Sequence, residues 1–371
     1  MFLLIHRYIF KEWLKTLFIT LMLIFGILML EDMYKNLKTF LEHGASFRTL
    51  CTYYAYLMPN CLCTVLPISF FISVLYILNN MQAHNEIIAL RASGMTVFQI
   101  TRSFWWAAVF LTMVMFVFNA YILPYTSREM QNIIQEIDYN YQKKQGNAPD
   151  RLGVKTNLLL HNEKMERLWR IHYFSLYTQR GGFVTLSFSH QGREIKRLEA
   201  EHVEYDASAG VWIFKNGKIW YFSEESRMPV RFVPFREWRF VCDETPQFMS
   251  YLYEPIKYLG MDKLERIIKF VDKNNPRFLE HRIKYFSILS SPLVCLVIVL
   301  LAIPFSLNGV RTNPMVGVSK AVGLFFIYYV LGGISKMLGT QNTVAPLVAA
   351  WLPNLTMLLL GVLLYRRLTP R

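Results

Sequence analysis

The sequence predicts an α-helical integral membrane protein with six transmembrane helices in two triplets, and an all-β domain inserted between the triplets. Composition is the first observation: 53% of the 371 residues are hydrophobic and 18% are charged, against about 45–50% and about 25% in soluble domains. The second is a set of six nearly charge-free stretches, since a membrane-spanning helix needs about 20 apolar residues. The third is a polar central block with short, β-rich runs.

The six predicted spans fall into a 3+3 pattern. They cover residues 16–30 (extended backwards by Trp13 and Leu14), 49–85, 103–127, 285–310, 315–337 and 338–365. Basic residues precede the first stretch, as in a signal peptide, but no small-residue cleavage site follows it. We therefore expect an uncleaved first helix. The predicted domains are 1–127 (first triplet), 128–281 (external block) and 282–371 (second triplet).

Short-loop basic residues predict the orientation, because Lys and Arg collect on the cytoplasmic side of a membrane. With the N-terminus inside, the cytoplasmic segments contain the basic residues Arg7, Lys11, Lys15, Arg91, Arg102, Arg311, Lys320, Arg366, Arg367 and Arg371, and the acids Glu12 and Glu86. The net charge of +14 is thus explained largely by topology, and nucleic acid is not needed as a partner. Both termini are expected in the cytoplasm and the central block outside it.

The central block predicts a β-sandwich, jellyroll or open barrel at about 150–245. Candidate strands are 168–174, 182–188, 211–214, 219–222 and 230–241, and Asn216-Gly217 suggests a type I′ hairpin turn. Aromatic residues alternate with Lys and Arg, which could form a nucleic-acid surface or the ordinary face of a half-solvated sheet. The external location favours the sheet. Helical connectors are expected at 129–144 and 261–273, the second ending at Asn274-Asn275-Pro276.

Catalytic and metal-binding signatures are missing from the sequence. It has no Gly-x-x-x-x-Gly-Lys-Ser/Thr phosphate loop, no Gly-x-Ser-x-Gly elbow and no His-Glu-x-x-His helix. Cys61 and Cys63 lack the two-residue spacer of redox motifs, and Cys242 has no nearby cysteine in the sequence. No span carries a mid-membrane Asp, Glu or Arg, which disfavours a proton-coupled carrier. We expect no enzyme activity, cofactor or metal in this chain, and a large amphiphile as the transported molecule.

A cytoplasmic helix is predicted at about 81–99, after the second span. Ala83, Ile87, Leu90 and Gly94 form one apolar, small-residue stripe, and Glu86 and Arg91 lie on other faces. The helix could rest on lipid headgroups, but such helices are usually rich in Lys and Arg. An acid near its start favours docking into the groove of a partner protein.

This segment also carries a family resemblance. The run Asn85-Glu86-Ile87-Ile88-Ala89-Leu90-Arg91-Ala92-Ser93-Gly94 resembles the loop after the second helix of the lipopolysaccharide export permeases LptF and LptG (the YjgP/YjgQ family). Supporting similarities are Arg7-Tyr8-Ile9, Leu66-Pro67, Asn354 with the basic tail, and the pattern from Glu201 to Trp212. The stretch 313–321 is more similar to LptG.

The resemblance implies a six-helix half-transporter with a periplasmic jellyroll in the inner membrane of a Gram-negative bacterium. It implies a paralogous permease partner, a cytoplasmic ATPase dimer that supplies the nucleotide site, and a single-span periplasmic bridge protein. Glu86 would anchor the coupling helix in the ATPase. The expected substrate is lipopolysaccharide, with Phe222 and Phe232 as contacts in the β-domain. Lys35 and Lys38 could meet its phosphates, although two lysines beside Glu31 and Asp32 equally suggest a solvated loop.

A second function class stays open at this point. A membrane-anchored scaffold or binding protein, with a periplasmic β-domain and no transport activity, would have the same topology. An intramembrane lipid enzyme would need polar catalytic groups that converge within the spans, and the sequence shows no such set.

Overall fold

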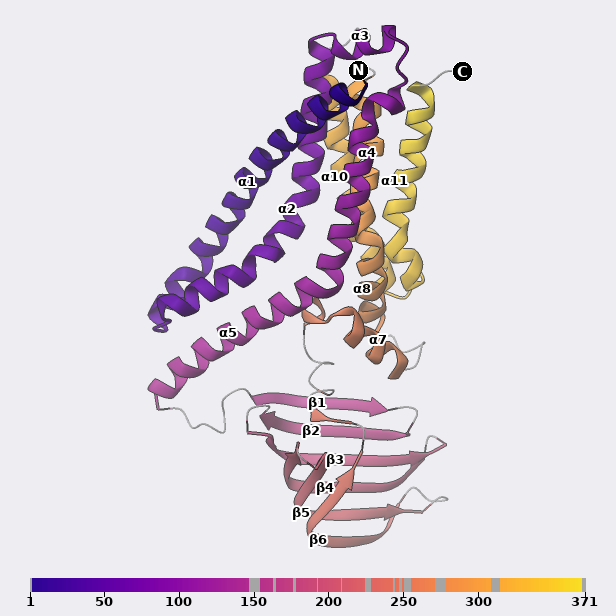
Figure 1. Ribbon diagram of the computed structural model, residues 1–371. Coiled ribbons are helices and arrows are strands. Elements are labelled where there is room, and N and C mark those ends of the chain that lie inside the picture. The colour runs from indigo at the N-terminus through magenta and orange to yellow at the C-terminus, as the bar shows by residue number, and fades with distance from the viewer. Residues whose placement is uncertain are drawn as a thin grey trace. The chain divides into compact units, whose positions relative to one another are not determined.

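The computed structural model describes residues 2–146, 154–162, 165–175, 178–191, 193–207, 209–223, 228–242, 244–246, 249, 255–270, 278–307 and 314–368. The chain divides into two compact units. The helical unit comprises residues 1–42, 46–130 and 276–371, and the β-domain unit comprises residues 43–45 and 131–275. Figure 1 shows the helices and strands of each unit.

The helical unit confirms the six predicted spans. Its elements are α1 (Phe2–Glu42), α2 (Phe47–Ala83), α3 (Glu86–Ala92), α4 (Val97–Val117), the π-helix η1 (Phe118–Ile122), the start of α5 (Leu123–Lys144), α8 (Leu279–Ser290), the 3₁₀ turn η5 (Ser291–Leu293), α9 (Val294–Leu307), α10 (Pro314–Thr340) and α11 (Pro346–Leu368). Within the residues that the structure describes, six helical segments are long and apolar enough to cross a membrane. The first is much longer than the charge-free run 16–30, because charged residues continue a helix readily beyond the apolar layer.

The spans differ in how far they are buried within the chain. The second span packs against α1 and α9, and 67% of its most apolar stretch is buried, against 11% in the first and fifth spans. Trp13 of α1 donates its indole N–H to Ser73 Oγ of α2 at 3.0 Å. The outward faces of α1 and α10 are therefore apolar surfaces that face lipid or another protein.

Prolines interrupt the spans, and side chains satisfy the backbone groups that they leave open. Pro353 in α11 has no N–H for the carbonyl of Ala349 four residues earlier, and Ser335 Oγ of α10 donates to that oxygen at 2.7 Å. Pro292 coincides with the break between α8 and α9. Asn354 Nδ2 donates to the Ser290 carbonyl at 2.6 Å. These bonds tie the last three spans together.

The described residues of the β-domain unit form six antiparallel strands in sequential order. They are β1 (Val154–Asn162), β2 (Arg167–Ser175), β3 (Arg180–His190), β4 (Arg193–Asp206), β5 (Val211–Phe222) and β6 (Pro229–Val241). The remainder of α5, the 3₁₀ turn η3 (Ile256–Tyr258) and α7 (Met261–Phe270) belong to the same unit. The predicted helix end at 271–273 and the Asn274-Asn275-Pro276 break lie outside the described residues.

The sheet bends along one row of residues. In every pair of neighbouring strands the regular pairing is interrupted at matching positions, one in each strand: Asn157, His172, Phe183, Glu201, Asn216 and Arg236. We call them the corner row. All six are exposed, and Asn157, Phe183 and Asn216, on alternate strands, have φ values of 57°, 51° and 53° in the left-handed region.

The alternation of buried and exposed residues shifts by one position at the corner row. In β4 the buried positions are Leu198 and Ala200 before the row and Val203 after it, and in β5 they are Phe214 before the row and Ile219 after it. A strict two-residue alternation cannot produce this pattern without an irregular residue.

The two sides of the corner row pack against each other as two layers. Trp169 and Trp212, from opposite sides, have ring centroids 5.1 Å apart, and Phe188 and Phe240 are 5.8 Å apart. A shared core contains Trp169, Phe174, Leu186, Leu198, Trp212 and Phe214 among others. The predicted all-β, jellyroll-like domain is thus a six-stranded meander folded into a sandwich.

The predicted hairpin turn at Asn216-Gly217 is wrong. Both residues lie inside β5, which runs unbroken for 12 residues. Asn216 belongs to the corner row, and Gly217 lies directly opposite Phe235, whose ring covers it. A left-handed Asn followed by Gly suits a tight turn and a bend within a strand equally well.

Candidate functional site

The predicted cytoplasmic helix is shorter than expected. Residues 81–83 end α2, residues 97–99 begin α4, and α3 spans only the seven residues Glu86–Ala92. Asn85 (φ 59°) precedes α3 and Gly94 (φ 87°) follows it, so a left-handed residue permits the turn on each side. Thr96 and Gln99 form a capping box that restarts the helix as α4.

The predicted apolar stripe does not form the outer surface of α3. Ile87 is 3% exposed and belongs to the core of the helical unit, and Leu90 packs against that core. Ile88, on the other side, is 42% exposed, and Ala89 and Ala92 are exposed beside it. The surface that α3 offers to another molecule is therefore made of Ile88, Ala89 and Ala92, with the exposed Arg91 beside them.

The other residues predicted for this site lie around that surface. Glu86 is in the first turn of α3 and Arg91 in the last turn. Ala83 is the last residue of α2, and Gly94 lies in the turn after α3; both are exposed. The Glu86 carboxylate is partly exposed and has no hydrogen-bond partner within the described part of the chain. It is thus available to a partner.

Lys35 and Lys38 lie on α1 and not in a loop. Lys35 pairs with Glu31 one turn earlier, and Lys38 Nζ lies 3.8 Å from Glu42 one turn later. Both lysines are highly exposed. Their charges are thus partly balanced within the helix, and a phosphate would compete with these acids.

Phe222 and Phe232 face away from the core of the β-sandwich. Phe232 lies directly opposite Trp220 in the register, and Trp220 follows the buried Ile219, so both rings are on the outer face. The Arg197 guanidinium, on that same outer face, lies 5.2 Å from the Phe222 ring. Neither phenylalanine lines the interior.

The interior presents other aromatic residues. Phe188, Trp238 and Phe240 are only partly buried against the core. Lys196 Nζ lies 5.2 Å from the Trp238 ring centroid, and the Arg167 guanidinium lies 5.0 Å from that of Phe240. An apolar interior with cations at its aromatic rim suits an amphiphile with acyl chains and anionic groups.

Several ionisable groups of the β-domain have structural partners. The buried Glu244 accepts a hydrogen bond from Asn162 Nδ2 at 2.7 Å and pairs with Arg167 at 3.3 Å. Burial, together with Glu244, raises the pKa of the Cys242 thiol to about 12, so the thiol stays protonated and unreactive. A hydrogen bond from Lys215 Nζ lowers the pKa of the Glu204 carboxyl. Among the described residues, no three His, Cys, Asp or Glu side chains converge to hold a metal.

The helical unit holds a cavity of about 500 Å³ among α2, η1, α8, α10 and α11. Asn119, Ser287, Lys336 and Asn354 contribute polar groups to its wall. The Ser287 hydroxyl is buried without a hydrogen-bond partner in the described part of the chain. The rest of the wall is mostly apolar, so the cavity offers a few hydrogen-bonding groups for water in an otherwise apolar space.

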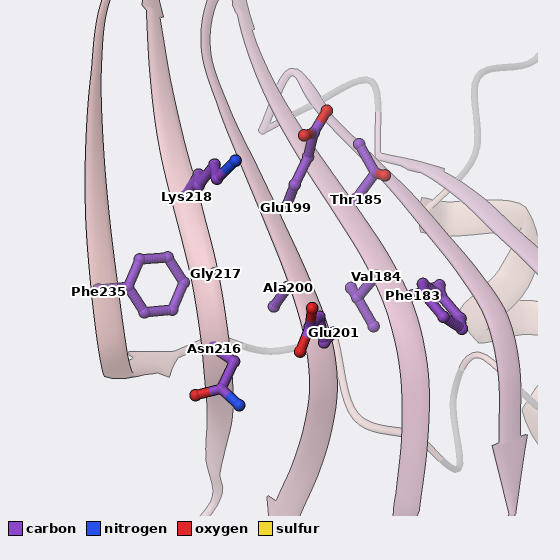
Figure 2. Close-up of a pocket in the computed structure, with 10 residues that line it drawn as sticks. All are labelled: Phe183, Val184, Thr185, Glu199, Ala200, Glu201, Asn216, Gly217, Lys218 and Phe235. Atoms are coloured by element: carbon purple, nitrogen blue, oxygen red, sulfur yellow. The ribbon is translucent and has the colours of Figure 1, made fainter.

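An open groove of about 570 Å³ lies on the β-domain beside the corner row. Figure 2 shows Thr185, Glu199 and Lys218 in one row across three strands, and Phe183, Glu201 and Asn216 on the far side of the row Val184, Ala200 and Gly217. This groove was not predicted from the sequence, because its residues come from four strands, β3 to β6, whose register is set only by folding. The left-handed Phe183 gives no signal in the sequence.

The whole chain resembles one family of transporters. A family model described as "Lipopolysaccharide export system permease LptF/LptG" matches residues 7–367. The match confirms the family predicted from the coupling-helix region and does not distinguish LptF from LptG. No curated protein sequence matches the chain. The match covers nearly the entire sequence, so the chain belongs to the LptF/LptG family of lipopolysaccharide export permeases.

Proposed function

We propose that this permease is the membrane-spanning subunit of an ATP-driven exporter of lipopolysaccharide. It pairs with a paralogous permease and binds a cytoplasmic ATPase dimer through α3. Both termini lie in the cytoplasm and the β-domain lies in the periplasm. Lipopolysaccharide leaves the inner membrane, enters the β-sandwich and passes to a single-span bridge protein that leads toward the outer membrane.

The geometry of α3 is the observation that carries this proposal. Two left-handed residues, Asn85 and Gly94, hold a seven-residue helix between two spans. Its inner face is fixed by the buried Ile87, and its outer face consists of Ile88 and small residues. A short helix anchored in this way transmits a push from a bound protein to α2 and α4, because it cannot rotate independently of them. Because the sequence has no phosphate loop, the proposal assigns ATP hydrolysis to a separate subunit.

The exposed spans support a permease partner. The first and fifth spans have most of their apolar surface outside the chain's own core, so a second permease could complete a substrate cavity against them. Closure of the ATPase dimer would narrow that cavity through α3. The acyl chains would then enter the apolar sandwich beside Trp238 and Phe240, and the cations at its rim would meet phosphates.

We expect Glu86→Ala to weaken the complex with the ATPase about tenfold, because a hydrogen bond to a charged group contributes roughly 1.5–3 kcal/mol. The measurement is the amount of ATPase that co-purifies with the full-length chain in mild detergent. Glu12→Ala is the matched control, since Glu12 is also an exposed acid in a predicted cytoplasmic segment. Equal recovery of the ATPase with Glu86→Ala and Glu12→Ala would remove Glu86 as the anchor.

The scaffold alternative makes a different prediction. A scaffold has no substrate-dependent effect on ATP hydrolysis, whereas a permease subunit should change the ATPase rate when lipopolysaccharide is added to the reconstituted complex. A rate that does not respond to lipopolysaccharide would favour the scaffold.

A further inference from the structure

The groove beside the corner row has a floor of strand backbone and two walls of side chains. Val184 and Ala200 are 1% and 6% exposed and point into the sandwich, and Gly217 has no side chain, so these three residues leave the strand backbones open as a floor. Phe183, Glu201 and Asn216 of the corner row form one wall, and Thr185, Glu199 and Lys218 form the other (Figure 2). Phe235 lies beside Gly217 and closes one end.

Phe183 is unusual in this groove. Its φ of 51° places a bulky residue in the left-handed region, and its side chain is 64% exposed. Its ring meets the rings of His172 and Tyr173 edge to face, with centroids 6.3 Å and 6.2 Å away. Such a residue costs about 1–3 kcal/mol of backbone strain, and strain of this kind is concentrated at functional sites. Gly or Asn would serve the bend better, so the aromatic ring itself needs an explanation.

The charged groups of the groove limit what it can bind. Glu201 has no partner within the described part of the chain, and Glu199 accepts a hydrogen bond from Trp220 Nε1 at 3.0 Å. The Glu199 carboxylate also lies 3.8 Å from the Arg197 guanidinium. The carboxylates of Glu199 and Glu201 disfavour a phosphate, and Lys218 disfavours a cationic side chain. The mixed polar wall disfavours an acyl chain. A neutral sugar ring fits, because its hydroxyls donate to carboxylates and its C–H face packs on an aromatic ring.

The substrate of this family has such a part. Lipopolysaccharide joins acyl chains to a saccharide, and an apolar interior such as that around Trp169 and Trp212 cannot take hydroxyl groups without leaving them unpaired. When acyl chains occupy the sandwich, the saccharide must lie outside it. The groove is on the outer side of the same strands.

We infer that this groove binds neutral sugar residues of lipopolysaccharide during export. Glu201 accepts hydrogen bonds from the sugar hydroxyls, and the Asn216 amide both accepts and donates them. The Phe183 ring stacks on the sugar ring. The inference rests on the proposed passage of lipopolysaccharide through the β-domain, and it assigns the saccharide part of that substrate to a site of its own.

The test is calorimetric titration of the full-length chain in detergent with core oligosaccharide from which acyl chains and phosphates have been removed. We expect saturable binding. Glu201→Gln should raise the Kd about tenfold through the loss of a charged acceptor, and Phe183→Gly should raise it roughly fivefold or more through the loss of stacking. Phe183→Gly should not lower the unfolding temperature, because Gly adopts positive φ freely.

Asn157→Gly is the matched control. Asn157 is a left-handed corner residue of β1 that does not line the groove, so its substitution should leave the Kd unchanged. The site is overturned if the unsubstituted chain binds no oligosaccharide, or if Glu201→Gln and Phe183→Gly bind as tightly as Asn157→Gly. Neither of these binding results would affect ATP-driven export by the reconstituted complex. If the reconstituted complex did not export lipopolysaccharide, the proposed function itself would be overturned.

Discussion

Gly217→Val should unfold the β-domain and leave the helical unit folded. A Cβ atom at this position would overlap the backbone oxygen of Glu199 and the ring of Phe235. The backbone oxygen belongs to β4 in the centre of the sheet and cannot move without breaking the ladder. We expect a loss of roughly 3 kcal/mol or more, at or above the upper end of overpacking effects, which is a large part of the stability of a domain.

Labelling of Cys242 with a maleimide measures this effect in the intact chain. Its thiol is partly buried, and its raised pKa of about 12 slows its reaction while the domain is folded. In a Cys51→Ser background, which removes the exposed cysteine, Gly217→Val should make Cys242 react rapidly. Gly210→Ala is the control: Gly210 has a positive φ, but a Cβ atom there would meet no heavy atom within 4 Å, so only about 1 kcal/mol is expected. Equal protection of Cys242 in both variants would contradict the close approach of the strands at Gly217.

Ile88→Asp should abolish ATPase binding without destabilising the permease. Ile88 is 42% exposed on the outer face of α3, where a carboxylate stays solvated in the free protein. In the complex the same carboxylate would be desolvated in an apolar contact, which costs several kcal/mol unless it is paired. A loss of at least about 100-fold in affinity is expected, since each 1.4 kcal/mol corresponds to a factor of ten.

Substitution of the neighbouring Ile87 should instead destabilise the permease. Ile87 is buried in the core of the helical unit, and Ile87→Ala should lower the free energy of unfolding by about 2–4 kcal/mol through the cavity it leaves. The two variants are compared by thermal unfolding and by ATPase co-purification in the same detergent. If Ile88→Asp retains the ATPase, the outer face of α3 is not the docking surface.

The sequence predicts the spans and their 3+3 arrangement well, because a long charge-free run such as 49–85 satisfies its backbone hydrogen bonds within a membrane by forming a helix. It predicts the existence of the β-domain for a similar reason, since alternating aromatic and charged residues such as those of 168–174 suit only a sheet with one solvated face. Both predictions depend on local composition, so they do not require knowledge of how distant segments pack in the folded chain.

The direction of individual side chains was less predictable. A stripe such as Ala83, Ile87, Leu90 and Gly94 shows that a helix has an apolar face, but tertiary packing decides whether that face binds a partner or the chain's own core. Phe222 and Phe232 illustrate the same limit in the sheet, because the corner row shifts the alternation by one residue and reverses every assignment beyond it. The left-handed Phe183 that contributes to this shift has no signature in the sequence.

ATP-dependent transfer of lipopolysaccharide tests the central claim most directly. Proteoliposomes would contain this permease, a paralogous permease, the ATPase dimer and lipopolysaccharide, with the bridge protein added as acceptor. We predict that lipopolysaccharide reaches the bridge protein only when ATP is hydrolysed, and that Ile88→Asp or Gly217→Val in this chain stops the transfer. Transfer that continues without ATP, or that is unchanged when this chain is omitted, would contradict the proposed export function.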